Sequence, residues 1–298
     1  MNDIVTLDTN ANYAAMAKAM GIASEGGKSE KKSNNLARLR IHHTPLMGQA
    51  EVKGKMVNME VVSGGMYKLE IPDGPTYYAP TAIIRPYVQR FMYKRFIKGQ
   101  GDQPNRYVKT VMEDNLNMDL KDNAGTFNCG KPSGYIADFK ALSDKMQDLI
   151  KQIKRVRVIL GTVELVDAVD DQGNPVDVAA TPFIWEIDNR DAFKSVGEVF
   201  ARYTKLRLLL PHHKITSTTE ERKLPSGSSF FLPVTTLDVT STHDITNEDK
   251  NTFADFMGWV SNYNTYILTT WKDSAMKDDD IDVDIVNDFI DIDSEEVA

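Results

Sequence analysis

The chain has 298 residues, of which 41% are hydrophobic and 26% charged, as in a soluble globular protein large enough to bury a sizeable core. Its single cysteine, Cys129, excludes an intrachain disulfide, and no apolar run reaches the roughly 18 residues that a membrane-spanning helix needs. The N-terminus lacks the basic region and apolar core of a secretory signal, so we expect an intracellular protein with no membrane partner.

The net charge of −8 is unevenly distributed along the chain. Residues 278–298 contain eight Asp, two Glu and no Lys or Arg, which leaves residues 1–277 with a net charge of +2. Acidic and apolar residues are mixed in this tail, and their mutual repulsion predicts that it stays disordered. We expect it either to act as a solubilising tail, or to compete with nucleic acid for a basic groove and dock on partner proteins.

The first 35 residues predict a short helix on a flexible arm. Within residues 10–22, Tyr13, Met16 and Met20 follow helical spacing. The Gly, Ser and charged residues of 23–35 bury too little surface to become ordered. A tethered apolar helix usually docks on its own body, on a neighbouring copy or on a partner, so residues 10–22 are candidates for self-association.

Residues 36–277 predict an α+β body. Its roughly eight to ten strands and three to four helices interleave unevenly, which favours an antiparallel sheet or an elaborated oligonucleotide-binding (OB-like) barrel. A turn at 63–65 predicts a hairpin between 55–62 and 66–71. Other strands are expected at 36–41, 106–111, 155–166, 183–187, 205–210, 214–219 and 230–240. Helices are expected at 138–152, from Asp188 or Asn189 onward, and after the capping-box sequence at 246–249.

Residues 81–98 combine cations with aromatic rings and contain no acid. Rings that stack on bases and cations that contact phosphates are what a binder of single-stranded nucleic acid requires. The same pattern also fits a half-buried strand whose rings belong to the core. Pro86 predicts an edge strand or a bulge. With the period of a strand, one face would carry Arg85, Tyr87, Phe91, Tyr93 and Arg95.

Candidate binding residues extend beyond this segment. Tyr77 and Tyr78 precede it and supply two further rings, while Arg155 and Arg157 form part of a second basic segment. The sequence does not fix whether these clusters converge on one groove. The complete set of candidate nucleic-acid-binding residues is Tyr77, Tyr78, Arg85, Tyr87, Arg90, Phe91, Tyr93, Lys94, Arg95, Lys131, Arg155 and Arg157.

Residues 125–131 match the first seven positions of a phosphate-binding loop, Gly-x4-Gly-Lys. Pro132 stands where that motif has Ser or Thr, and the preceding residues are polar rather than a buried strand, so we expect no nucleotide hydrolysis. Lys131 is kept as a candidate phosphate contact. The histidine pairs and the lone cysteine lack metal-site spacing, and no catalytic motif is present, so we expect no metal, no cofactor and no enzymatic activity.

The order of a tethered helix, a basic and aromatic body and an acidic-apolar tail resembles the bacteriophage single-stranded-DNA-binding proteins. Residues 11–21 resemble the N-terminal segment of the helix-destabilising proteins of T-even phages, and residues 278–293 resemble their acidic terminus. The resemblance implies cooperative contacts between neighbours through the first segment and recruitment of replication and recombination proteins through the second. The zinc-binding Cys/His set of that family is missing, because Cys129 stands alone.

We therefore expect a protein that binds single-stranded DNA without strong sequence preference in the host cytoplasm. It would protect the strand during replication, recombination and repair. Its expected parts are an N-terminal helix and linker at 1–35, an OB-like body at 36–277 and an interaction tail at 278–298. One alternative is a virion component or replication adaptor that does not bind DNA directly. Another is an enzyme whose active residues come together only in the fold.

Overall fold

A computed structural model describes residues 36–275 except 53–54, 100–104, 225–226 and 228. The predicted N-terminal helix and arm, and the acidic tail at 278–298, lie outside the described residues. Three α-helices lie within the described part: α2 (Asp144–Gln152), α3 (Arg190–Leu206) and α4 (Asn247–Ala275). The strands are β1 (Ala37–Ile41), β2 (Leu46–Val52), β3 (Lys55–Val62), β4 (Tyr67–Glu70), β5 (Thr76–Ala79), β6 (Thr81–Ile97), β7 (Arg106–Lys109), β8 (Ile153–Val166), β9 (Thr181–Ile187), β10 (Ile215–Lys223) and β11 (Ser229–Leu237).

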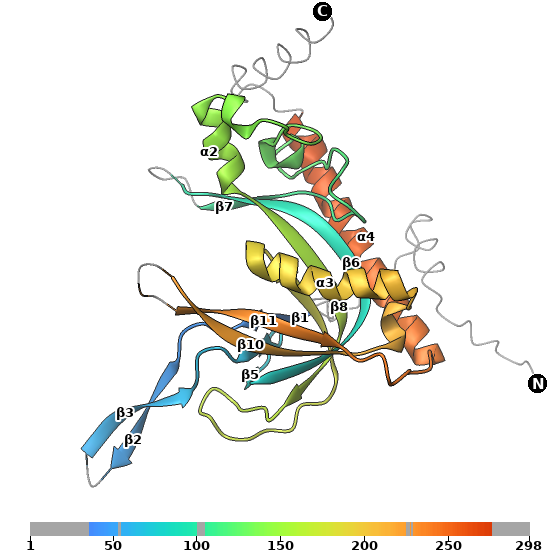
Figure 1. The fold of residues 1–298 in the computed structure, drawn as a ribbon. Coiled ribbons are helices and arrows are strands. Elements are labelled where there is room, and N and C mark those ends of the chain that lie inside the picture. Colours follow the sequence, from blue (N-terminus) through green and yellow to red (C-terminus); the bar gives the residue numbers. More distant parts are fainter. Residues whose placement is uncertain (1–35, 53–54, 100–104, 225–226, 228, 276–298) are drawn as a thin grey trace, which may run out of the picture. The chain divides into compact units, whose positions relative to one another are not determined.

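One large sheet carries most of these strands (Figure 1). Its order is β11-β10-β6-β8-β9-β1-β4-β5, with β7 paired to part of β6. Every neighbouring pair is antiparallel except β1 and β9. The α+β prediction with a mostly antiparallel sheet is confirmed. The expected barrel closure is not observed, because no pairing joins β11 to β5 among the described residues.

Helices α3 and α4 cover opposite faces of this sheet. Along β8, Ile159 packs in the cluster that includes Phe200 of α3, whereas Val158 packs in the cluster that includes Phe256 of α4. This alternation is the period-two pattern of a strand buried on both sides. The long central strands β6 and β8 are therefore enclosed where the two helices lie over them.

Two predicted elements are wrong. Strand β3 does not form a hairpin with residues 66–71; it pairs with β2 in a separate two-stranded sheet, while β4 pairs with β1 and β5. The segment 205–210 is not a strand, because α3 continues to Leu206. Arg207 then adopts a left-handed conformation (φ 55°) and its N–H donates to backbone oxygens of the last helical turn, which ends the helix.

The helix starts follow local capping chemistry. The Asn189 side chain accepts hydrogen bonds from the N–H groups of Asp191 and Ala192 at the start of α3, as predicted. Thr246 and Asp249 form the predicted capping box of α4, each side chain accepting the other residue's N–H. Helix α2 begins later than expected, at Asp144. Within the described residues, no helix is long and apolar enough to cross a membrane.

Candidate nucleic-acid interface

A bulge interrupts β6 in the middle of the predicted binding segment. The pairing with β8 shifts register between Pro86 and Val88, so Tyr87 is an extra residue in β6. The bulge predicted from Pro86 is confirmed, although β6 is a central strand. Opposite the bulge, a side chain at Gly161 would collide with the backbone oxygen of Arg85, so glycine permits the close approach of the two strands.

The bulge sends the predicted rings to different sides of the sheet. The Tyr87 ring packs against Phe256 of α4 at 5.7 Å between centroids, whereas the Phe91 ring packs against Phe193 of α3 at 6.1 Å. Since one extra residue reverses the period-two alternation, residues before and after the bulge cannot be read with one period. The expectation that all five residues share one face is therefore wrong.

Of the four candidate tyrosines of β5 and β6, three are enclosed in the fold and the fourth is partly buried. Tyr78, Tyr87 and Tyr93 are each at most 5% exposed, and Tyr77 is partly buried against the core under α3. Rings so enclosed present no face for a base to stack on. The expectation that they lie open is wrong, because aromatic side chains in a strand buried on both faces serve as core.

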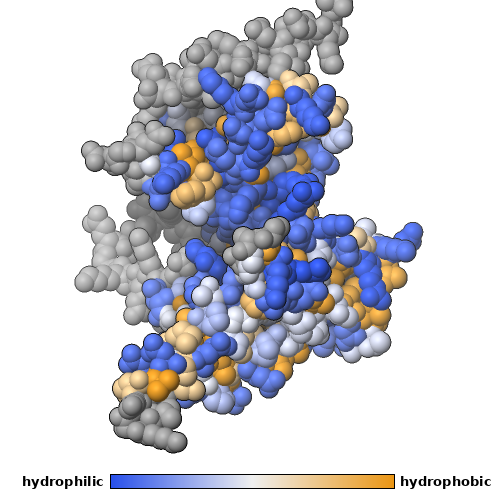
Figure 2. All heavy atoms as spheres, turned by 60° about the vertical axis from the view of Figure 1, so that its left-hand side comes forward, coloured by the Kyte–Doolittle hydropathy of each residue, from blue (hydrophilic) through white to orange (hydrophobic). Residues whose placement is uncertain are grey.

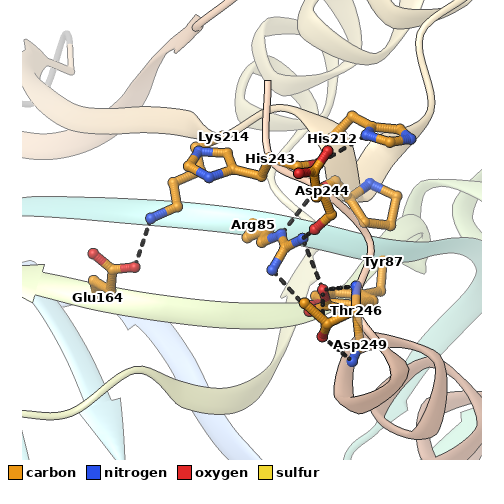
Figure 3. A network of polar contacts seen from close by, with 10 residues as sticks. Arg85, Tyr87, Glu164, His212, Lys214, His243, Asp244, Thr246 and Asp249 are labelled. Atoms are coloured by element: carbon orange, nitrogen blue, oxygen red, sulfur yellow. Dashed lines mark hydrogen bonds and ion pairs between the residues drawn. The ribbon is translucent and has the colours of Figure 1, made fainter. Parts of the chain in front are cut away.

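Arg85 is held by the first turn of α4 and by backbone oxygens of the segment between α3 and α4 (Figure 3). Its Nη1 donates to Asp249 Oδ1 at 2.8 Å, and its Nε donates to the Pro211 backbone oxygen at 2.7 Å. The Tyr87 hydroxyl donates to the same Asp249 carboxylate, which Thr246 also contacts. Burial opposes ionisation of Asp249, but the hydrogen bonds from Tyr87, Thr246 and Arg85 outweigh it and lower its pKa to about 2. Arg85 and Tyr87 thus lock α4 onto β6.

Two other predicted cations of β6 form ion pairs within the protein. Arg90 Nη1 lies 2.8 Å from Asp114 Oδ1, and Lys94 Nζ lies 3.0 Å from Asp188 Oδ2. Arg95 Nη1 donates to a backbone oxygen in the glycine-rich loop at 3.2 Å, and burial lowers its pKa. These internal contacts leave each of the three cations less able to bind a phosphate, the role predicted for them from the sequence.

The glycine-rich loop carries its own anion. One Asp122 oxygen accepts the N–H groups of Ala124 and Thr126, and the other accepts the N–H of Cys129, so a carboxylate occupies the donors that a phosphate would need. Lys131 Nζ folds back onto two neighbouring backbone oxygens. Burial raises the pKa of the Cys129 thiol, which keeps it protonated. The resemblance to a phosphate loop is confined to the sequence.

Three predicted residues do come together on the α3 side. The Arg157 guanidinium lies 5.0 Å from the Phe91 ring centre and 4.6 Å from that of Phe193, and its Nη1 donates to Gln89 at 2.9 Å. Arg155 lies over the other part of the stack, 5.5 Å from the Phe193 ring. Burial lowers the pKa of Arg157 to about 10, so it remains charged at neutral pH. Of the two arginines, only Arg155 is exposed.

A groove opens where β1 and β9 diverge. These strands pair only at Ala37 with Phe183 and Arg38 with Ile184, and beyond those positions both strands line a hollow of about 790 Å³. Other walls come from β6, β7, the start of α3, and β11 with the loop before it. Figure 2 brings this side of the molecule forward and shows mainly hydrophilic residues across its middle. The junction of two diverging strands therefore creates this hollow.

Cations from three strands, β1, β6 and β7, line this groove. Arg38 and Arg40 alternate with the buried Ala37 and Leu39, and both are exposed. Arg40 Nε lies 3.6 Å from Glu70, an exposed pair of small energetic weight. Lys94 and Lys109 also line the groove, but Glu186 and Asp188 pair with them there. The arginines of β1 are thus the cations best placed to meet an incoming anion.

Exposed rings flank the cations. Tyr107 of β7 is 54% exposed and lines the groove, and its ring lies 5.1 Å from that of Phe96, which is also exposed. On the opposite wall, Phe231 stacks on His43 with ring centres 6.4 Å apart and planes inclined by 20°. Exposed rings and cations therefore lie together at this groove, but they are not the ones predicted on β6.

Sequence reasoning missed most of the groove residues. Lys94 is the one member of the predicted set that lines it. The missed signals were local alternations: Arg38 and Arg40 share the outer face of β1, and Tyr107 shares a face of β7 with Lys109. Because the groove joins β1, β6, β7, β9 and β11, no single segment of sequence marks it.

Comparisons of the chain with protein-family models, with curated proteins and with solved structures find no match. Among the described residues, no group of three or more His, Cys, Asp or Glu side chains is placed to hold a metal ion. The functional assignment therefore depends on the geometry and charge of the groove.

Proposed function

We propose that this protein binds single-stranded DNA, without strong sequence preference, in the groove between β1 and β9. The observation that carries the proposal is the exposure of Arg38 and Arg40 beside the exposed Phe96–Tyr107 ring pair. Rings accept any base by stacking, and guanidinium groups bind phosphate oxygens, so the combination recognises a strand rather than a sequence. The groove thus takes the role that the sequence analysis gave to β6.

The acids of the groove shape this binding. Glu186 and Asp188 neutralise Lys94 and Lys109, which leaves positive charge concentrated along β1. A strand would follow the arginine side of the groove and turn its bases toward Tyr107. We further propose that the acidic tail at 278–298 competes for these arginines and recruits replication and recombination proteins, as in proteins of bacteriophage type.

The test is a salt series of oligo-dT binding by fluorescence anisotropy. In single strands each neutralised phosphate contributes about 0.7 to the slope of log affinity against log salt, so changing both Arg38 and Arg40 to Ala lowers the slope by about 1.4. The matched control changes Arg202 and Lys205, two exposed cations at the far end of α3, to Ala. An unchanged slope in the β1 variant, or an equal loss in the control, would exclude the groove as the binding site.

A second candidate function is that of a non-catalytic adaptor or structural protein. The observation that favours it is the exposure of Met47, Met56 and Met59 on the β2–β3 hairpin, because exposed apolar side chains gathered on one element mark protein–protein contacts. This candidate predicts a stable protein complex together with a flat response in the salt series.

A further inference from the structure

The β2–β3 hairpin stands apart from the large sheet. It pairs from Leu46 opposite Val62 to Val52 opposite Lys55, and it forms its own two-stranded sheet. In Figure 1 it projects from the described body beyond β1 and β4. Two-stranded hairpins are at best marginally stable in water, and a third strand or a packed face is what usually stabilises them. This hairpin therefore lacks the support expected of it within the described chain.

One face of the hairpin is apolar. Val57 and Met59 are 46% and 48% exposed, and the cross-strand register places Gly48 on the same face. A side chain at Gly48 would lie 2.6 Å from Val61 Cγ1, so glycine lets the valine lie flat across β2. The opposite face is mixed, with Gln49 beside Asn58. The apolar face presents a flat surface that water solvates poorly.

The outer edge of β3 is open over a short and definable segment. A side chain at Gly173 would lie 2.6 Å from the Val61 backbone oxygen, so the turn at 170–174 covers β3 at that end. Residues 56–60 have no strand partner on that side within the described structure. Charged residues and prolines normally protect an edge strand, but this segment contains a single charged residue, Glu60, and no proline. The centre of this open segment is Asn58.

The chemistry of the hairpin selects a protein occupant. Residues 46–62 contain two Glu and two Lys, a net charge of zero, and no aromatic ring. Such a surface has neither the cations that phosphates need nor the rings that bases need. An open antiparallel edge is complementary to an identical edge related by a two-fold axis, since both supply the same alternating donors and acceptors.

We propose that β3 pairs with β3 of a second copy of this chain, antiparallel about a two-fold axis at Asn58. This register places Val57 opposite Met59 of the second copy, so the two apolar faces join in one four-stranded sheet. The proposed interface uses none of the residues that line the β1–β9 groove, and it does not depend on residues 10–22. The proposed dimer does not depend on whether the groove binds DNA.

Disulfide trapping in the full-length chain tests the register. In the proposed pairing the two Asn58 Cα atoms lie roughly 4.5–5.5 Å apart, within the reach of a disulfide. Because Cys129 is 1% exposed, a cysteine introduced on the hairpin is the reactive one. We expect mild oxidation of Asn58→Cys to give a disulfide-linked dimer as the main species on a non-reducing gel.

The matched control is Gln49→Cys, on the same hairpin face and directly across from Asn58. In the proposed dimer its two copies are about 14 Å apart, three strand spacings, which no disulfide spans. Equal cross-linking at both positions would indicate random collision and would overturn the proposal. So would cross-linking confined to position 49.

Sedimentation equilibrium of the untagged chain provides the second measurement. We expect the wild type to dimerise and Met59→Lys to raise the dimer dissociation constant at least tenfold. At concentrations where both chains are monomeric the melting temperature should not change, because the Met59 side chain is exposed. A wild-type chain that remains monomeric at all concentrations would overturn the proposal. An oligomer indifferent to Met59→Lys would also overturn it, and would point to residues 10–22 instead.

Discussion

The central strand β6 and the β1–β9 groove contain the same kinds of residue but use them differently. In β6 the rings pack under α3 and α4, and the cations bind carboxylates and backbone oxygens. At the groove, β1 and β9 separate after two paired positions, and Arg38, Arg40 and Tyr107 stay exposed. Alternating rings and cations are therefore enough to predict a strand. Whether these side chains can contact a ligand depends on whether helices cover the strand.

The largest expected effect is on stability, at the hydrogen bonds between Asp249 of α4 and the side chains of β6. Asp249→Ala leaves Arg85 and the Tyr87 hydroxyl without their shared partner, so we expect a loss of about 3 kcal/mol in the free energy of unfolding. Urea denaturation measures it, and the affinity of the folded fraction for oligo-dT should not change. Asp114→Ala is the control, because its pair with Arg90 is exposed and worth less than about 1 kcal/mol. An equal loss in both variants would contradict the locking role of Asp249.

The next effect concerns the rings of the groove. Changing Phe96 and Tyr107 together to Ala should weaken oligo-dT binding by about 2 kcal/mol, roughly thirtyfold, because each stacked base contributes about 1–3 kcal/mol. Fluorescence anisotropy at fixed salt measures it. Tyr135→Ala, which removes a highly exposed ring outside the groove, should bind like the wild type. Wild-type affinity in the double variant would show that Phe96 and Tyr107 do not stack on bases, and the proposed difference between the groove and β6 would then be wrong.

A smaller effect is the pH dependence of the Asp249 contribution. The pKa of Asp249 in the fold, about 2, lies below the ordinary carboxyl value near 3.9, so its stabilisation is complete above about pH 4 and is lost as the pH falls toward 2. The difference in unfolding free energy between the wild type and Asp249→Asn should therefore narrow over that interval. A difference that stays constant from pH 5 to pH 2 would show that the ionised carboxylate is not what stabilises α4.

The smallest effect concerns the tail. Deleting residues 278–298 should tighten oligo-dT binding at low salt by less than about tenfold, because ten acids no longer compete for the groove arginines. The gain should vanish at high salt, where the competition is screened. Combining the deletion with the Arg38→Ala and Arg40→Ala changes should abolish the gain. If it persists, the tail acts elsewhere.

The sequence predicted local features well where one segment determined them. The caps at Asn189 and Thr246, the bulge at Pro86 and most strands depend on neighbours in the chain. Prediction from the sequence failed where the environment of a residue depends on segments far away in the chain. The exposure of Tyr87 depends on α4, which follows it by 160 residues or more, and the donors of the glycine-rich loop are taken by Asp122. The groove was missed because its lining comes from five strands, β1, β6, β7, β9 and β11, that lie far apart in the sequence.

The extra residue in β6 changes which residue numbers face each side of the sheet. Before Tyr87, the even-numbered Ala82 and Ile84 belong to the core under α3; after it, the odd-numbered Phe91 packs against Phe193 of α3. Because Pro86 pairs with Gly161 and Val88 pairs with the adjacent Leu160, removing Tyr87 would take away the bulge and the Tyr87–Asp249 hydrogen bond but would leave every later residue of β6 on its present side. A single-codon deletion at Tyr87 should therefore be better tolerated than a deletion elsewhere in β6, which would shift the register against β8 and turn the later side chains to the other face.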